Sequence, residues 1–194
     1  SSELCCFRLF ATHHHHTSEI PNKVANLRTM LSIQISREQN STDTSDDNYS
    51  HGIYAVNYGT DLTISTAGDV SSNDRGIYSW NDGSGTLSVT STGDVTALGA
   101  DGIYADNADW STDTRSASSA TDINITVNII TAYDEGISVN NYGTGSTTIT
   151  STGQITGGSG QQDQTVESAG IRVKNEATAK NITIMAKNVE GSSS

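Results

Sequence analysis

The sequence predicts an all-β fold, a right-handed, single-stranded parallel β-helix (a solenoid) of about five coils. The main observation is a Gly-Ile hexapeptide that returns five times, as GIYAVN from Gly52, GIYSWN from Gly76, GIYADN from Gly102, GISVNN from Gly136 and GIRVKN from Gly170. Hydrophobic residues within each copy alternate with period two, as side chains do along a β-strand. Repeats of 20 to 50 residues made only of strands and turns are typical of a solenoid, and parallel crossovers are right-handed in nearly all cases.

Composition by itself would indicate disorder, because 36 of the 194 residues are Leu, Ile, Val or Phe and the net charge is −12. The placement of those residues in columns favours a thin folded rod instead. The acidic charge and the ten scattered Lys and Arg residues exclude nucleic acid as a partner. No apolar run is long enough for a membrane-spanning helix. The adjacent Cys5 and Cys6 cannot provide a disulfide framework.

The first strand of each copy follows the repeat glycine. One residue after that glycine the sequence has Ile53, Ile77, Ile103, Ile137 and Ile171. Three residues after it, on the same strand face, a small or β-branched residue stands in each copy: Ala55, Ser79, Ala105, Val139 and Val173. These ten positions are predicted to point inward.

A second and a third strand complete each copy. The second has the pairs Leu62/Ile64, Leu87/Val89, Ile123/Ile125, Thr147/Ile149 and Ile182/Ile184, and the third has Val70, Val95, Ile130, Ile155 and Val189. Val127 lies outside these columns. The two longest copies carry insertions at 108–121 and 157–167, which are expected to be loops that leave the coil unchanged.

The chain is divided into four parts. Residues 1–30 are expected to be irregular, with a His13–His16 tract typical of a purification tag or vector sequence. Residues 31–50 should form a partial capping coil and a polar loop, residues 51–190 the β-helix, and residues 191–194 a tail. The segment CCFRLFA is too short for the apolar part of a secretion signal.

Asparagine stands five residues after every repeat glycine, at Asn57, Asn81, Asn107, Asn141 and Asn175. Asn tolerates sharp turns, and its amide can bond to the same amide one coil away. We therefore expect a continuous Asn ladder along the rod.

An outward aromatic column is the strongest binding candidate. It contains Tyr54, Tyr78 and Tyr104, with Trp80 beside it. We expect these three tyrosines to face solvent, where they could dock sugar rings or a partner surface. The alternative is that stacked Tyr rings only stabilise the sheet.

Several acidic residues raise the alternative of an enzyme, because paired carboxylates cleave sugars on some β-helices. Asp69 and Asp94 occupy equivalent turns, and Asp101, Asp134 and Glu135 precede repeat glycines. The aspartate in GGSGQQD does not fit the calcium-binding RTX repeat. We expect no catalytic residues, no metal site and no cofactor, and we interpret His51 as a surface residue.

The strings GIYAVNYGTDLTISTAGDV and GIYSWNDGSGTLSVTSTGDV resemble the passenger-domain repeats of bacterial autotransporters, the type V secretion proteins. The resemblance covers about residues 51–190. It implies a β-helical stalk that is secreted or displayed at the outer membrane and serves adhesion or self-association, as in adhesins and virulence factors. The family has no shared catalytic residues. Because no signal peptide or barrel segment is recognised, we expect a fragment of a longer protein.

The predicted function is that of a non-enzymatic passenger or stalk segment. Its partners would be a host surface, a carbohydrate or other copies of the chain. The alternative is a fragment of a β-helical polysaccharide-degrading enzyme or phage-tail depolymerase. In isolation the segment is expected to be marginally stable and prone to end-to-end association.

Overall fold

The computed structural model describes backbone and side chains at residues 51–109, 114–159, 168–176 and 178–192, and backbone alone in strands at 7–11, 31–35 and 39–41. The regular elements in these ranges are all β-strands, and all strand pairs run parallel. The same ranges contain no helix that could cross a membrane. The His13–His16 tract and the two cysteines lie outside the described residues.

Six strands, one for each repeat copy and one before them, form the first sheet. In sheet order they are β1 (Phe7–Ala11), β4 (Ile53–Asn57), β7 (Ile77–Asn81), β10 (Ile103–Asp106), β13 (Ile137–Asn141) and β15 (Ile171–Asn175). Ile53 pairs with Ile77, Ile77 with Ile103, and so on to Ile171. The register predicted from the aligned glycines is therefore confirmed.

The second sheet has ten strands and is strongly curled. One row contains β2 (Leu31–Ile35), β5 (Leu62–Thr66), β8 (Leu87–Ser91), β11 (Ile123–Val127), β14 (Thr147–Thr156) and β16 (Ile182–Glu190). The other contains β3 (Gln39–Ser41), β6 (Val70–Ser72), β9 (Val95–Ala97) and β12 (Ile130–Ala132). Strand β14 joins the rows because it pairs with β11 in its first half and with β12 in its second.

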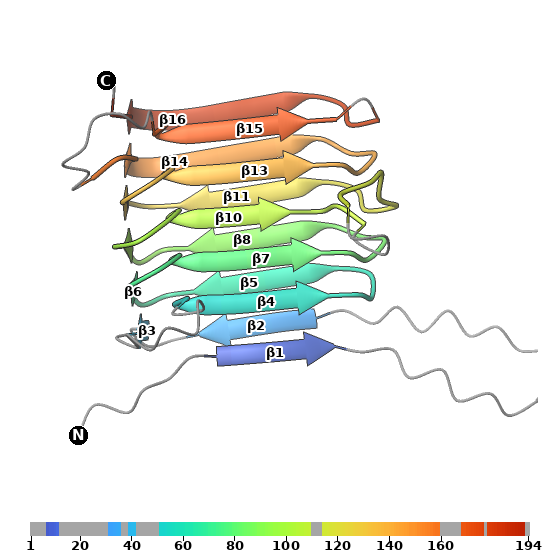
Figure 1. Cartoon of the computed structure of the whole chain (residues 1–194), viewed down its shortest axis with the longest axis horizontal. Coiled ribbons are helices and arrows are strands. Elements are labelled where there is room, and N and C mark those ends of the chain that lie inside the picture. Colours follow the sequence, from blue (N-terminus) through green and yellow to red (C-terminus); the bar gives the residue numbers. More distant parts are fainter. Residues whose placement is uncertain are drawn as a thin grey trace, which may run out of the picture.

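The copies lie on top of one another in chain order (Figure 1). Strands of the first sheet point one way in this view, and β5, β8 and β11 behind them point the opposite way. Each strand bonds to its counterpart in the next copy, for example through the Ile77 N–H, which donates to the Gly102 carbonyl at 2.9 Å. The backbone hydrogen bonds of the strands are therefore made between neighbouring copies and not within one copy.

The core is a single apolar column between the two sheets. All predicted inward residues of the first four copies are buried. The apolar ones form this core, and the polar Ser79 and Thr147 lie among them. Val127 lies outside the predicted columns, but it is 2% exposed and belongs to this core. It stands in register with Thr66 and Ser91, whose hydroxyl oxygens lie 2.9 Å apart. The position is inward in every copy but usually polar, and the apolar columns therefore missed it.

The repeat glycines are required by close packing of adjacent copies. A Cβ on Gly76 would lie 2.6 Å from the Gly102 carbonyl oxygen, which is far below van der Waals contact. Gly52, Gly102 and Gly136 meet a carbonyl of the next copy in the same way, and Gly170 meets the Glu190 carbonyl. Only glycine allows this approach directly before the first strand of each repeat copy.

The N-terminal part holds more strand than the sequence indicates. Strand β1 falls inside the segment expected to be irregular, and its Phe7 and Leu9 stand in register with Ile53 and Ala55. Strand β2 covers the predicted capping coil, and β3 lies within the segment expected to be a polar loop. These strands extend both sheets below the first copy.

Candidate functional site

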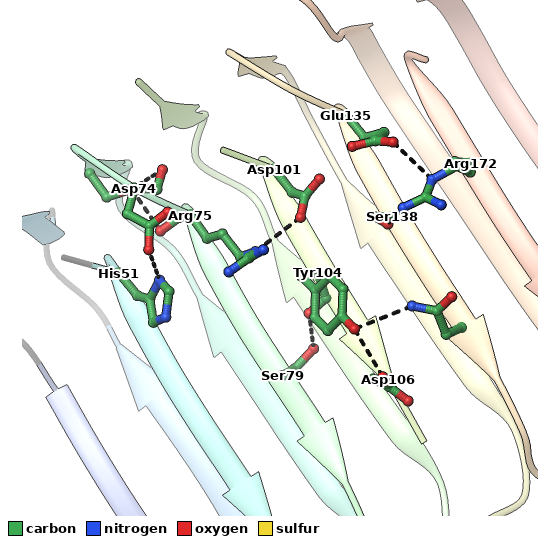
Figure 2. Close-up of polar contacts among 12 residues, drawn as sticks. His51, Asp74, Arg75, Ser79, Asp101, Tyr104, Asp106, Glu135, Ser138 and Arg172 are labelled. Atoms are coloured by element: carbon green, nitrogen blue, oxygen red, sulfur yellow. Dashed lines mark hydrogen bonds and ion pairs between the residues drawn. The ribbon is translucent and has the colours of Figure 1, made fainter. Parts of the chain in front are cut away.

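The outer face of the first sheet carries an ordered strip of aromatic and charged side chains, which we call the outer strip. It consists of His51, Tyr54, Asp74, Arg75, Tyr78, Asp101, Tyr104, Asp106, Asp134, Glu135, Ser138 and Arg172. Residues between two inward positions of a strand point to the opposite face, which places the tyrosines here. Figure 2 shows how the polar members reach from one strand to the next.

The aromatic column is a continuous stack along the rod. The ring centroids of Tyr54 and Tyr78 lie 4.9 Å apart and those of Tyr78 and Tyr104 5.2 Å apart, with interplanar angles of 12° and 14°. The Arg75 guanidinium carbon lies 5.1 Å from the Tyr104 centroid. Burial, with the neighbouring Tyr54 adding to it, raises the pKa of Tyr78 to about 12.

Tyr104 does not face solvent as predicted, because it is only 8% exposed. Its hydroxyl donates to Asp106 Oδ2 at 2.9 Å and accepts from Asn140 Nδ2 at 3.3 Å. Arg115, from the described part of the 108–121 insertion, also contacts this hydroxyl and pairs with Asp106 at 2.9 Å. The insertion thus folds back over the column, a contact that strand periodicity cannot reveal.

This burial weakens the sugar-docking hypothesis for the column. A sugar ring docks on the flat face of an aromatic ring, whereas these rings already use their faces on one another and on Arg75. Trp80 donates through Nε1 to the Ala108 carbonyl at 2.9 Å and meets Tyr58 edge to face at 5.7 Å. Tyr58, 46% exposed, is the more accessible ring here, and sequence reasoning missed it because it stands outside the repeat columns.

His51 is not a surface residue, since it is 1% exposed. Its Nδ1 lies 2.9 Å from Asp74 Oδ2, and its ring stacks on Tyr54 with centroids 5.5 Å apart. Burial opposes ionisation of Asp74, but the bond and charge of His51 and the charge of Arg75 hold the pKa of Asp74 below its usual range. The His51 ring also stacks on Tyr78, with centroids 5.3 Å apart, so it packs against two rings of the column.

A charged column precedes the repeat glycines, with His51, Arg75, Asp101 and Glu135 at the same position in successive copies. Arg75 Nε lies 3.0 Å from Asp101 Oδ2. Arg172 Nε lies 2.8 Å from Glu135 Oε1, and its Nη2 donates to Ser138 at 3.0 Å. Opposite charges stand in neighbouring copies within this column and the outward Tyr column, which contains Arg172. That sequence signal could have indicated the Arg75–Asp101 and Arg172–Glu135 pairs.

The predicted acids separate into two groups. Asp101, Asp134 and Glu135 come together, with one oxygen of each within 4.8 Å of the others. Asp69 and Asp94 instead hold neighbouring turns, since Asp69 Oδ1 accepts the Asp94 N–H at 2.8 Å and Asp94 Oδ1 accepts from Asn128 Nδ2 at 3.0 Å. These bonds assign the pair a role in linking copies.

The asparagines stand in register, but their amides do not form one unbroken ladder. Asn57 Nδ2 donates to Asn81 Oδ1 at 2.6 Å, and Asn107 Nδ2 to Asn141 Oδ1 at 2.8 Å. Thr147 links Asn141 to Asn175, with hydroxyl contacts of 3.1 and 2.9 Å. Among the described contacts no amide bond joins Asn81 to Asn107, and Asn81 Nδ2 donates instead to the Thr60 and Gly85 carbonyls.

Comparisons with protein-family models, with curated proteins and with solved structures found no match for this chain. Most polar groups of the outer strip bond to the next copy or to the adjacent insertion. The exception is the acidic cluster, where Glu135 lies within hydrogen-bond reach of the Asp101 and Asp134 carboxyls.

Proposed function

We propose that the chain is a segment of right-handed parallel β-helix, of about five coils, that serves as a non-enzymatic stalk. By its resemblance to autotransporter passengers, it would belong to a protein secreted from or displayed on a bacterial cell. The observation that carries this proposal is that polar side chains bond from copy to copy. Asp69 accepts from the next copy, Tyr104 accepts from Asn140 of the next copy, and buried asparagine amides pair between copies. Such contacts stiffen a rod.

We propose self-association through the rod ends as the activity of this stalk. Among the described strands β16 pairs only with β14, so its other edge is not covered by any of them. The residues that continue the core columns there are Ile182, Ile184 and Val189, which are 45%, 45% and 46% exposed. An end of this kind favours a further strand with the same alternation.

The opposite end of the same chain offers such a strand. Leu31 and Ile33 of β2 stand in register with Leu62 and Ile64, in the column that ends at Ile182 and Ile184. A second copy could therefore stack its β2 on the first copy's β16 without changing the register. Head-to-tail contacts of this type do not close, and they build filaments.

Sedimentation velocity over a concentration series tests this proposal. The unmodified chain should sediment faster as its concentration rises, and Ile184→Lys should remain monomeric because the charge would enter the continued core. Thr183→Lys is the matched control, since Thr183 is exposed on the opposite face of the same strand. The end contact is supported if the unmodified chain and Thr183→Lys associate while Ile184→Lys does not. A monomeric unmodified chain, or equal association of both variants, would refute it.

A polysaccharide panel tests the non-enzymatic part. Incubation with pectin, alginate and capsular polysaccharides should leave the chain length of each polymer unchanged. Cleavage that Asp69→Asn or Asp94→Asn abolishes would replace the stalk proposal with the depolymerase alternative.

A further inference from the structure

The acidic cluster of the outer strip consists of Asp101, Asp134 and Glu135. It holds the one buried side-chain oxygen among the described residues that has no hydrogen-bond partner. Asp101 is 4% exposed, and its Oδ1 has no hydrogen-bond donor. Figure 2 shows this carboxylate between Arg75 on one side and Glu135 on the other. A buried carboxylate oxygen without a donor destabilises the folded state, so a partner from outside the chain is indicated.

The three carboxylates share one arrangement. Asp101 Oδ2 is engaged by Arg75 Nε at 3.0 Å, Asp134 Oδ1 accepts from Ser168 Oγ at 3.0 Å, and Glu135 Oε1 pairs with Arg172 Nε at 2.8 Å. Each carboxylate thus has one oxygen engaged outside the cluster, and Glu135 lies within hydrogen-bond reach of the Asp101 and Asp134 carboxyls. The held oxygens fix the orientation of the carboxylates, as outer partners do in metal sites.

We infer that Asp101, Asp134 and Glu135 bind a calcium ion between the third and fourth copies. Their ligand oxygens lie within 4.8 Å of one another. Ca²⁺ binds oxygen at about 2.3–2.6 Å in flexible geometry, so two of its ligands can stand up to about 5 Å apart. Water would complete the six to eight ligands that Ca²⁺ usually takes.

The charge balance sets the expected strength of the site. Arg75 and Arg172 offset two of the three negative charges, which weakens attraction for a cation. The affinity should therefore resemble that of extracellular calcium modules, with a Kd of about 10⁻⁴–10⁻³ M. Burial and neighbouring carboxylates raise the pKa of Asp134 and Glu135, so protons should compete with the ion in mildly acidic solution.

Isothermal titration of the EDTA-treated full chain with CaCl₂ tests the inference. One saturable site should appear, with a rise in Tm of about 4 °C at ten times the Kd. Asp134→Asn should lose both responses while keeping its fold by circular dichroism, because an amide oxygen can still accept from Ser168. Glu190→Gln removes the same charge from an exposed position and should keep both responses.

Three outcomes would overturn the inference. One is the absence of saturable heat and of a Tm shift, which would mean that the carboxylates share protons rather than an ion. Another is an equal response in Asp134→Asn, which would assign the effect to surface charge. An equal response to MgCl₂ would refute the assignment to calcium.

Discussion

Arg75 Nε lies 3.0 Å from Asp101 Oδ2 and so joins the second repeat copy to the third. The Asp101 side chain is 6% exposed and that of Arg75 32% exposed. The same guanidinium also lies over the Tyr104 ring, 5.1 Å from its centroid. One side chain therefore neutralises a buried acid and covers the aromatic stack.

Replacing Arg75 should destabilise the rod. In Arg75→Gln the buried Asp101 would lose its cation, and we expect the free energy of unfolding to fall by about 2–3 kcal/mol in urea titrations. The control is Arg172→Gln, because Arg172 is 55% exposed and its pairing should contribute under about 1 kcal/mol. Equal losses in the two variants would contradict this ranking.

Removal of one buried asparagine tests the ladder. In Asn81→Ala the Asn57 amide loses its acceptor in a fully buried position, and the expected loss of stability is about 2 kcal/mol. Asn124→Ala, on the exposed face of β11, should change stability by less than about 0.5 kcal/mol. Urea unfolding followed by circular dichroism measures both, and a harmless Asn81→Ala would refute a stabilising role.

The repeat glycines should tolerate no side chain. Gly76→Ala would place its Cβ 2.6 Å from the Gly102 carbonyl oxygen and against Val95, so neighbouring copies would have to separate. We expect a loss of about 3 kcal/mol or more. Ser84→Ala, in an exposed turn of the same copy, is the control. A native urea midpoint for Gly76→Ala would show that the copies can move apart at little cost.

The acidic cluster should make stability depend on pH. Because the folded state raises the pKa of Asp134 and Glu135 above the ordinary 3.8 and 4.5, it binds protons more tightly than the unfolded state there. Their contribution to stability is therefore present at low pH and is lost as pH rises through the raised pKa values. Asp74 acts in the opposite sense, since its lowered pKa adds stability above 3.8 that is lost on acidification.

The variant Asp134→Asn separates these effects. In EDTA it should be more stable than the unmodified chain at pH 7, and this advantage should shrink as pH falls towards 4. Urea titrations at several pH values measure the difference between the two proteins. A difference that stays constant with pH would contradict the raised pKa as its cause.

Much of the architecture could be predicted because each copy repeats the same local pattern. Ile77 and Ser79 point inward for the same reason as Ile53 and Ala55, and their glycines align the copies. The prediction missed Val127, because its column is mostly hydroxyl residues, and it gave no strand at β1, which has no preceding repeat glycine. It also placed Tyr104 and His51 in solvent, although both are buried.

The sequence by itself determined which residues recur at which interval, and therefore the strand faces, the register and the composition of the core. Only the tertiary structure decided which groups on the outer face meet. Asp101, Asp134 and Glu135 are up to 34 residues apart in the chain, and Arg115 reaches Tyr104 through an insertion with no repeat pattern. Local periodicity governs backbone pairing, whereas the contacts of outward side chains depend on how far each copy and each loop extends.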